Sequence, residues 1–304
     1  MNEASTVGND ATDPATGVFM AHRNLLFTVA YEMLGSAADA EDVLQETWLR
    51  WGTVDLGQVQ DQRAYLVRIT TRQALNRLRT MKRRKEAYVG PWLPEPLLTA
   101  PDVAENVELA ESVSMAMMLV LETLSPTERA VFVLREVFDV GYDEIAAAVD
   151  KSPAAVRQIA HRARRHVDAR RPRQAVSADK SQAAVQAFQR ALETGELQGL
   201  LDVLAPEVVL VSDGGGVKKA ALRPITGAEK VIRFIAGGSA KAEATLTGDA
   251  TEVNGHPALV LRVNGEIDGV MAVRVEDGRI AGIYYVRNPE KLTRIASQTP
   301  LVVR

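Results

Sequence analysis

The chain has 304 residues, of which 46% are hydrophobic, and this length suits two or three domains with buried cores. The formal net charge is −3, so a surface that binds nucleic acid must come from a local cluster of basic residues. There is no cysteine, which excludes disulfides and cysteine-ligated zinc and is consistent with a reducing cytoplasm.

The first residues carry no targeting signal. They read MNEASTVGNDATDP, a polar and acidic segment that has neither the apolar core of a signal peptide nor a basic arm. No apolar run in the sequence approaches the ~20 residues that span a bilayer. We therefore expect a cytoplasmic protein that makes no contact with membranes.

Two helices are predicted before residue 52. The first covers 17–34, has apolar residues at helical spacing and ends at Gly35. The second covers 36–51, reads SAADAEDVLQETWLRW and begins at a Ser36 cap. Its inner stripe includes Val43 and Trp48, and the side chains expected to face outward include Asp39, Asp42, Gln45 and Glu46. This acidic surface would repel DNA and suits a basic protein partner.

A third helix is predicted over 61–81 and carries a basic run. Nine basic residues and no acidic residue lie between Arg63 and Lys85. Such a surface suits the phosphates of DNA. The segment that follows, 87–107, contains Pro91, Pro94, Pro96 and Pro101, which favour an extended path. On this evidence it is interpreted as a semi-rigid linker.

The segment 124–171 predicts a helix-turn-helix. Ser125, Pro126 and Glu128 form the start signal of one helix, with Glu128 as the capping-box partner. A short helix follows over 142–149, and Ser152 repeats the start signal for a third helix. A short helix, a tight turn and a basic helix are typical of this DNA-binding motif.

The last of these helices has an apolar stripe and a basic outer side. The residues expected near its exposed side are Arg157, Gln158, His161, Arg162 and Arg165. Arginine binds phosphate and contacts guanine in the major groove. A solvated basic helix in an ordinary bundle is the alternative. The motif alone would also fit a repressor, an invertase or a sigma factor.

The remaining segment predicts an α+β domain. Helices are expected over 179–194, 196–204 and 227–236. Strands are expected over 208–212, 219–223, 242–252, 257–263, 267–276 and 279–286, with several joined by turns at Asn-Gly or Asp-Gly. Helices followed by a curved antiparallel sheet give a cone with a pocket.

The polar residues of this cone do not compel a catalytic role. Asp213, Asp268 and Arg287 are candidates for a polar pocket, and His256 is more simply a turn residue. We expect Asp213 to stabilise its own glycine turn and Asn288 to cap a helix. No catalytic residue, metal ion or cofactor is predicted.

Three segments resemble those of bacterial sigma factors. DAEDVLQETWLRW resembles their core-polymerase-binding helix, RAYLVRITTRQALNRLRTMKRRKE resembles their promoter-melting, minus-ten segment, and LSPTERAVFVLREVFDVGYDEIAAAVDKSPAAVRQIAHRARR resembles their minus-thirty-five domain. The resemblance covers about residues 16–172 and is to the extracytoplasmic-function group, which has only these two conserved domains.

This resemblance implies roles for individual residues. Core polymerase binding is implied for Asp39, Asp42, Gln45 and Glu46. Contact with the minus-ten element is implied for Arg72, Asn76, Arg77 and Arg79. Contact with the minus-thirty-five element is implied for Ser152, Arg157, Gln158, His161, Arg162 and Arg165.

Three further motifs are similar to those of one subgroup, which carries a fused SnoaL-like C-terminal domain. The linker motif WLPEPL corresponds to Trp92, Leu93, Pro94, Glu95 and Pro96 with the leucine that follows. The motif DGGGK corresponds to Asp213, Gly214, Gly215 and Gly216, with Lys218 displaced by an inserted valine. The motif NPDKL corresponds to Asn288, Pro289, Glu290, Lys291 and Leu292, with glutamate in place of aspartate. We expect these regulatory motifs to lie near one another or at an interdomain surface.

The expected fold class is therefore multidomain: two all-α sigma domains, the second with a helix-turn-helix, and an α+β SnoaL-like, nuclear-transport-factor-2-like cone. The expected divisions are 16–86, a linker over 87–107, 108–172 and 178–304. The expected function is transcription initiation, regulated in cis by the cone, with core RNA polymerase and promoter DNA as partners. A small-molecule ligand or a protein at the C-terminal pocket stays open as a third partner. The alternative is a ligand-sensing DNA-binding regulator that does not associate with polymerase.

Overall fold

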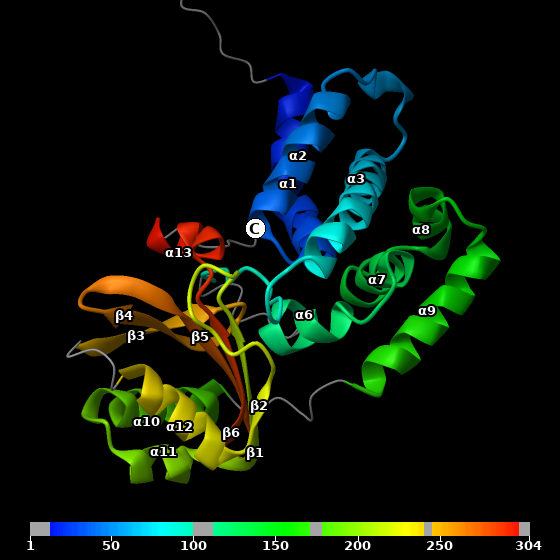
Figure 1. Cartoon of the computed structure of the whole chain (residues 1–304). Helices are drawn as coiled ribbons and strands as arrows, with labels where there is room; N and C mark the ends of the chain where they lie inside the picture. Colours follow the sequence, from blue (N-terminus) through cyan, green and yellow to red (C-terminus); the bar gives the residue numbers. More distant parts are fainter. Residues whose placement is uncertain (1–12, 100–111, 171–177, 240–244, 298–304) are drawn as a thin grey trace, which may run out of the picture.

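The computed structural model describes residues 13–99, 112–170, 178–239 and 245–297 (Figure 1). The expected divisions therefore run partly outside the described residues, at 100–111, 171–177 and 298–304. Two helical domains lie on one side of the molecule in Figure 1 and a sheet with its own helices lies on the other. This arrangement confirms the expected fold class.

The first helical domain is a bundle of three long helices. They are α1 (Pro14–Leu34), α2 (Ala37–Trp51) and α3 (Gln62–Glu86), with a short 3-10 turn η1 (Leu56–Gln58) between the last two. The left-handed Gly35, at φ 70°, ends α1, and the Ser36 side chain accepts a hydrogen bond from the Asp39 N–H to cap α2. The third helix continues to Glu86, beyond the predicted end at 81.

The second helical domain contains the predicted helix-turn-helix. Its elements are α6 (Met115–Leu121), α7 (Pro126–Phe132), the π turn η2 (Val133–Val137), α8 (Tyr142–Val149) and α9 (Pro153–Asp168). Ser125 and Glu128 form the predicted capping box, and Ser152 caps α9 by accepting from the Ala155 N–H. Asp150 turns the chain between α8 and α9 in the left-handed conformation, at φ 56°.

The cone consists of a six-stranded sheet and three helices. The strands are β1 (Leu204–Asp213), β2 (Ile225–Thr226), β3 (Leu246–Val253), β4 (His256–Val263), β5 (Glu266–Glu276) and β6 (Arg279–Val286), in the order β2-β1-β6-β5-β4-β3. The β1–β6 pair is parallel and the other pairs are antiparallel. The helices are α10 (Ala178–Thr194), α11 (Leu197–Val203) and α12 (Ala228–Ser239). The chain then continues through η3 (Pro289–Lys291) and α13 (Thr293–Ala296).

Several boundaries in the cone differ from the prediction. The first strand begins at Leu204, where a helix over 196–204 was predicted to end, because Leu204 already pairs with Ile280. The predicted strand over 219–223 is irregular chain, and the short β2 comes after it. The predicted start of β3 at 242–244 lies outside the described residues.

The two faces of the sheet are covered by different parts of the chain. Helices α10, α11 and α12 cover one face around Phe188, Leu210 and Met271. On the other face, Val260 and Val270 of the sheet belong to one buried cluster with Leu93 of the linker, Met115 of the second helical domain, and Leu292 and Ile295 from the end of the cone. The linker and the second helical domain thus share a core with the cone.

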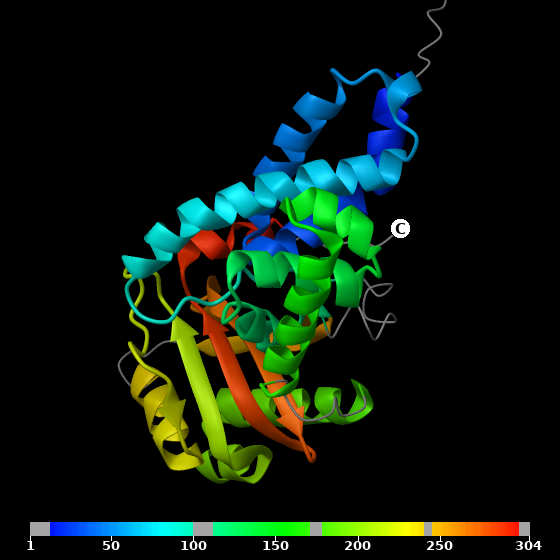
Figure 2. The same cartoon turned by 90° about the vertical axis from the view of Figure 1, so that its right-hand side faces the viewer.

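The two helical domains also pack directly on each other. The long helix α3 contacts both α7 and α8 of the second helical domain. Figure 2 shows α3 crossing the helices of that domain and reaching the loop that follows β1. No helix in the described part of the chain is long and apolar enough to cross a membrane.

Candidate functional site

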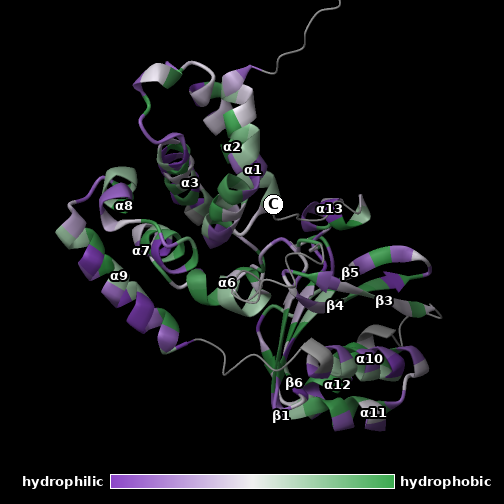
Figure 3. Ribbon diagram, turned by 180° about the vertical axis from the view of Figure 1, so that it is seen from behind, coloured by the Kyte–Doolittle hydropathy of each residue, from purple (hydrophilic) through white to green (hydrophobic). Residues whose placement is uncertain are grey.

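The recognition helix α9 buries one side and exposes the other. Its buried residues are Val156, Ile159, Ala160, Ala163 and Val167. All five residues predicted to lie near its exposed side, Arg157, Gln158, His161, Arg162 and Arg165, are exposed, as is the capping Ser152. In Figure 3 the ribbon of α9 alternates between hydrophilic and hydrophobic colours along its length. The helix therefore presents a polar, cationic side that fits a DNA groove.

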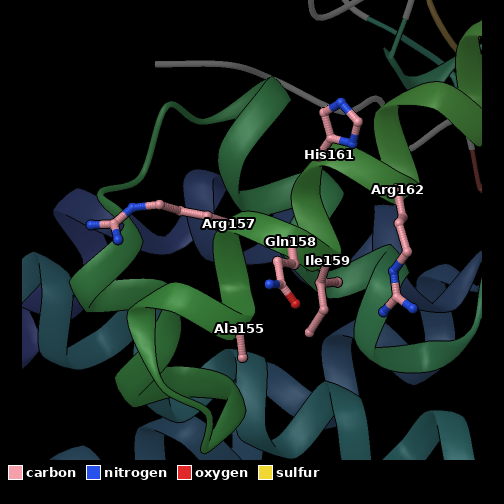
Figure 4. Close-up of a pocket in the computed structure, with 6 residues that line it drawn as sticks. All are labelled: Ala155, Arg157, Gln158, Ile159, His161 and Arg162. Atoms are coloured by element: carbon pink, nitrogen blue, oxygen red, sulfur yellow. The ribbon is translucent and has the colours of Figure 1, made fainter.

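A hollow of about 560 Å³ lies on this side of α9 (Figure 4). It is lined by Ala155, Arg157, Gln158, Ile159, His161 and Arg162. The neighbouring Arg164 is bound differently, because its guanidinium donates to both carboxylate oxygens of Glu136, at 2.9 and 2.6 Å. Arg164 therefore ties α9 to η2, whereas Arg162 lines the hollow.

The residues expected to contact the minus-ten element are partly engaged within the protein. The Arg72 guanidinium donates to the carbonyl of Ala147 in α8, at 2.8 Å. Arg77 is ion-paired with Asp39, at 2.6 Å, and with Asp42. Asn76 is exposed and accepts from Arg79 at 3.2 Å. Arg72 and Arg77 are thus bound to other helices, whereas Asn76 and Arg79 bond each other within α3.

The acidic side of α2 is less open than predicted. Asp39 was predicted to face outward but is 7% exposed, because Arg77 of α3 covers it. Asp42 and Gln45 are exposed, and Glu46 accepts a hydrogen bond from Gln73 at 2.8 Å. The helical period places these residues on one side correctly, but nothing in the sequence indicates that Arg77 of a neighbouring helix covers Asp39.

The end of the cone reaches the same helix. Arg294 of α13 donates to Glu41 at 3.0 Å, and Glu41 also pairs with Arg23 of α1 at 2.7 Å. The Arg294 guanidinium lies 5.5 Å from the ring centroid of Phe27. A segment that follows the last strand of the cone is therefore bound to the acidic side of α2.

The three regulatory motifs meet in one buried cluster. The Asp213 carboxylate, which is fully buried, accepts from the backbone N–H of Leu93 at 2.9 Å and from the Lys291 ammonium at 2.7 Å. Lys291 also donates to the carbonyl of Leu93 at 2.6 Å. We call Tyr88, Trp92, Leu93, Asp213 and Lys291 the motif cluster. The expectation that these motifs lie near one another is confirmed.

Two aromatic rings enclose the Lys291 ammonium. Its Nζ lies 3.3 Å from the centroid of the Trp92 ring and 5.0 Å from that of Tyr88, whose hydroxyl donates to Asp213. Burial lowers the pKa of Lys291 to about 8, although the neighbouring Asp213 opposes this shift. The cluster thus holds a desolvated cation between a carboxylate and the faces of two rings.

The glycines and the asparagine of these motifs are explained by close contacts. A side chain at Gly214 would meet the carbonyl oxygen of Lys218 at 2.0 Å, and one at Gly215 would meet Asn288 at 2.5 Å. Asp213 accepts from the Gly215 N–H and so stabilises the glycine turn, as predicted. Asn288 caps η3 by accepting from the Glu290 N–H, with Pro289 in the first turn, also as predicted.

Glu95 of the linker motif binds the start of α2. Its carboxylate accepts from the backbone N–H groups of Ala37 and Ala38, at 2.8 and 3.2 Å, and from Ser36. A carboxylate at a helix N-terminus is favoured by the helix dipole. Pro94 and Pro96 on either side of it are buried. The linker is therefore packed against the first helical domain along its motif.

Lys218 belongs to a separate polar group in the cone. Its ammonium donates to Asp268 at 3.1 Å, and Asp268 is bound as well by Arg287, at 2.8 Å, and by the Tyr285 hydroxyl. Burial would raise the pKa of Asp268, but hydrogen bonds from Arg287 and Tyr285 lower it. Among the described residues, no group of three or more His, Cys, Asp or Glu is placed to hold a metal ion.

A buried polar interface between the two helical domains was missed by the sequence prediction. Arg129 of α7 is 2% exposed and donates to the Glu32 carbonyl and to the Glu122 carboxylate, both at 2.7 Å. Lys85, at the end of α3, pairs with Glu122 at 2.5 Å. The Glu32 carboxylate is fully buried and accepts from Ser112 at 2.8 Å. Helical periodicity in the sequence did not indicate that these residues lie at an interface between domains.

The pKa values of two carboxyl groups at this interface are shifted in opposite directions. Burial raises the pKa of Glu32 to about 8, against the lowering effects of the Ser112 hydrogen bond and the Arg129 charge. Burial would also raise the pKa of Glu122, but Arg129 and Lys85 reverse this and lower it to about 2. The interface thus contains one ion-paired carboxylate and one carboxyl group that favours its protonated form.

Known proteins resemble this chain over nearly its whole length. The family Sigma-70 region 2 matches residues 18–84, and the family Sigma-70, region 4 matches residues 114–167. The ECF RNA polymerase sigma factor SigJ of Mycobacterium tuberculosis (strain ATCC 25618 / H37Rv) is 36% identical over 90% of this chain and 92% of its own. The probable ECF RNA polymerase sigma factor SigI of M. tuberculosis (strain CDC 1551 / Oshkosh) is 31% identical over 94% and 97%. The crystal structure of M. tuberculosis SigJ superposes with a TM-score of 0.72 at 33% identity, covering 91% of this chain and 98% of that one.

Proposed function

The chain belongs to the extracytoplasmic-function (ECF) sigma factors of RNA polymerase, and from this premise we propose how it is regulated. It binds core RNA polymerase and directs it to promoters, and its SnoaL-like cone controls this activity in cis by holding the two helical domains together. The single observation that carries the proposal is the motif cluster, in which cone and linker are joined through Asp213 and Lys291.

The packing of the two helical domains supports a closed, inactive arrangement. The minus-ten and minus-thirty-five elements lie about 25 base pairs apart, which is about 85 Å along B-DNA at about 3.4 Å per base pair. The helix proposed to bind the minus-ten element is packed directly against the helix-turn-helix that carries α9, because Arg72 of α3 donates to Ala147 of α8. A protein in this arrangement cannot reach both elements at once, so promoter binding requires the domains to separate.

The cone is placed to oppose that separation. Its buried cluster includes Leu93 of the linker and Met115 of the second helical domain, and its α13 reaches α2 through Arg294 and Glu41. Each of these contacts would be lost if the domains moved apart. The cone is therefore proposed to stabilise the closed arrangement.

The polar groups of the cone favour control by contact over catalysis. Asp213 is engaged with Lys291, Tyr88 and the linker, and Asp268 is engaged with Arg287, Tyr285 and Lys218. A general acid or base needs a free proton-transfer position facing a substrate. A small-molecule or protein ligand of the cone stays a prediction.

Transcription in vitro with purified core enzyme tests the proposal. Full-length protein is compared with a chain ending at residue 287, which keeps the cone but lacks Lys291 and Arg294, and with a chain ending at residue 176, which lacks the cone. The chain ending at 287 is expected to bind core enzyme and transcribe more strongly than full-length protein. Equal activity of all three would overturn regulation in cis. If the full-length protein does not copurify with core polymerase, the alternative of a DNA-binding regulator is favoured.

A further inference from the structure

The β3–β4 hairpin turn of the cone contacts the first helical domain, the linker and the start of the second helical domain. Asn254, the first residue of this turn, is fully buried. Figure 1 places the β3–β4 end of the sheet beneath the helical domains, on the side of α13. The turn did not belong to any of the three regulatory motifs.

The Asn254 side chain is hydrogen-bonded to three different segments. Its Nδ2 donates to the Tyr31 hydroxyl of α1 at 2.7 Å and to the Val113 carbonyl before α6 at 2.8 Å. Its Oδ1 accepts from the Leu97 N–H of the linker at 3.0 Å. One amide group thus joins the first helical domain, the linker and the start of the second helical domain.

Tyr31 extends this network into the linker. Its hydroxyl donates to the Glu95 carbonyl at 2.7 Å while it accepts from Asn254, and the side chain is fully buried. Burial raises the pKa of the Tyr31 hydroxyl, so it acts as a neutral donor. If the cone withdrew, the Asn254 amide, the Leu97 N–H and the Val113 carbonyl would lose these partners together. Buried polar groups that lose their partners are costly.

A second turn in the cone has the same local geometry but, among the described residues, no interdomain hydrogen bond from its asparagine. Asn254 and Asn264 both have φ 54°, and each is followed by a left-handed glycine. Among the described residues, the Asn264 side chain accepts from the Thr245 N–H, at 3.1 Å, which is a contact within the cone. A type I′ turn accepts asparagine or glycine at this position. The conformation of the turn therefore does not require the Asn254 side-chain amide. The role of this amide lies in its bonds to other segments.

We propose that Asn254 is a positioning residue that holds the linker and both helical domains in the closed arrangement. It acts through Tyr31 and Val113, one contact on each helical domain, so that neither domain can leave without breaking the same amide's bonds. The inference rests on the proposed function, since it concerns the separation that promoter binding requires. It assigns the restraint to a turn outside the regulatory motifs.

Asn254→Gly and the matched Asn264→Gly variant test this. Each change removes one asparagine side chain from a turn. Glycine also adopts the backbone conformation of these turns, so the local effects of the two changes are alike. The chain has no cysteine, so Gln60→Cys and Asp168→Cys, at exposed positions of the two helical domains, accept a dye pair. Energy transfer between the dyes, with the full chain, measures the closed fraction.

Asn254→Gly is expected to raise the ratio of open to closed protein roughly tenfold or more, the effect of losing buried hydrogen bonds. Asn264→Gly is expected to match wild type. Equal transfer in all three proteins would overturn the inference, as would an equal loss in both variants, which would indicate general weakening of the cone. If Asn254→Gly fails to fold, Tyr31→Phe removes the same contact from α1 and is expected to lower the transfer. Unchanged transfer in Tyr31→Phe would then contradict the inference.

The proposed function is checked separately on the wild-type protein. If wild-type protein supports no transcription with core enzyme, the proposed function fails whatever the energy transfer. Wild-type protein that supports transcription leaves the proposed function standing. If the chain ending at residue 287 then opens while Asn254→Gly stays closed, regulation in cis stands and the role of Asn254 is rejected.

Discussion

Lys291 and Asp213 form an ion pair of 2.7 Å in which the carboxylate is fully buried. The same ammonium lies 3.3 Å from the centroid of the Trp92 ring, so one lysine joins the end of the cone, the glycine turn and the linker. The two charges have little access to water. The stability of the closed arrangement should therefore depend strongly on both partners being present.

Lys291→Met is expected to destabilise this arrangement by about 3–5 kcal/mol, because it leaves the Asp213 carboxylate buried without a cation. The thermal midpoint of unfolding and the fluorescence of Trp92 report the loss. Lys230→Met, at an exposed position of α12, is the control and should change neither. A Lys291→Met protein as stable as wild type would show that the pair contributes nothing to closure.

The contact between the helical domains should loosen as the pH rises. Burial raises the pKa of Glu32 from its ordinary value of 4.5 to about 8, so the closed protein holds a proton that the opened protein releases. Stability from this group is complete below about pH 4.5 and is lost as pH rises toward 8, by up to about 1.4 kcal/mol per pH unit.

Glu32→Gln should reduce the dependence of stability on pH, which chemical denaturation at a series of pH values measures. Glu95 has a pKa that burial also raises, so part of the slope remains in the variant. Among the described residues, Ser112 donates to the Glu32 carboxyl group and Arg129 donates to the Glu32 backbone carbonyl. Identical pH profiles of stability for the variant and wild type would show that groups other than Glu32 cause the pH dependence.

Two arginines of α9 should differ in their effect on promoter binding. Arg162 is exposed and lines the hollow, so Arg162→Ala should cost roughly 1–3 kcal/mol if it contacts a base and should relax preference at one position of the upstream element. Arg164→Ala, on the same helix, should lower stability and leave sequence preference intact, because Arg164 is bound to Glu136. Binding to a set of altered promoter duplexes measures both. An equal effect of the two substitutions would point to phosphate attraction without base contact.

Reversal of charge on the acidic side of α2 should prevent holoenzyme assembly. Asp42→Lys combined with Glu46→Lys places two positive charges where a basic partner surface is proposed to bind. Glu207→Lys, an exposed change in the cone, is the control. Gel filtration with core enzyme measures assembly, and circular dichroism checks the fold, since Asp42 also pairs with Arg77. A folded double variant that assembles normally would reject this surface.

Release of α13 from the same helix should have the opposite effect. Arg294→Ala removes one of the two cations that neutralise Glu41 and leaves Arg23 in place. The pair is partly exposed, so the gain in affinity for core enzyme should be modest, up to about fivefold. Titration of fluorescent protein with core enzyme gives the dissociation constants. Unchanged affinity would mean that α13 and polymerase do not compete for this helix.

Local signals in the sequence predicted the helix-turn-helix well. Ser125, Glu128 and Ser152 fix helix starts through hydrogen bonds to neighbours three residues away, so the sequence holds the whole interaction. The meeting of the linker, glycine and Asn288–Leu292 motifs was also expected, from motifs that resemblance to a subgroup had singled out. No spacing rule predicts that Lys291 approaches Trp92.

Long-range polar contacts were not predictable. Tyr31 and Glu32 lie in an apolar helical pattern, and Asn254 lies in an ordinary hairpin turn, so each has a sufficient local explanation. Their partners come from distant parts of the chain, and polar burial depends on those partners. Asp39 was wrongly placed on the surface for the same reason, because its cover comes from Arg77 of the next helix.

The linker also serves as a short extra strand at the edge of the sheet. Leu98 pairs with Val253 of β3, and the Thr99 N–H donates to the Glu252 carbonyl at 3.1 Å. Opening of the protein would remove the linker from β3 and leave backbone donors and acceptors of this edge strand unpaired. Unpaired edges attract extended chains from other molecules. The opened protein is therefore expected to self-associate through this edge. Rapid binding of the opened protein to polymerase would limit this self-association.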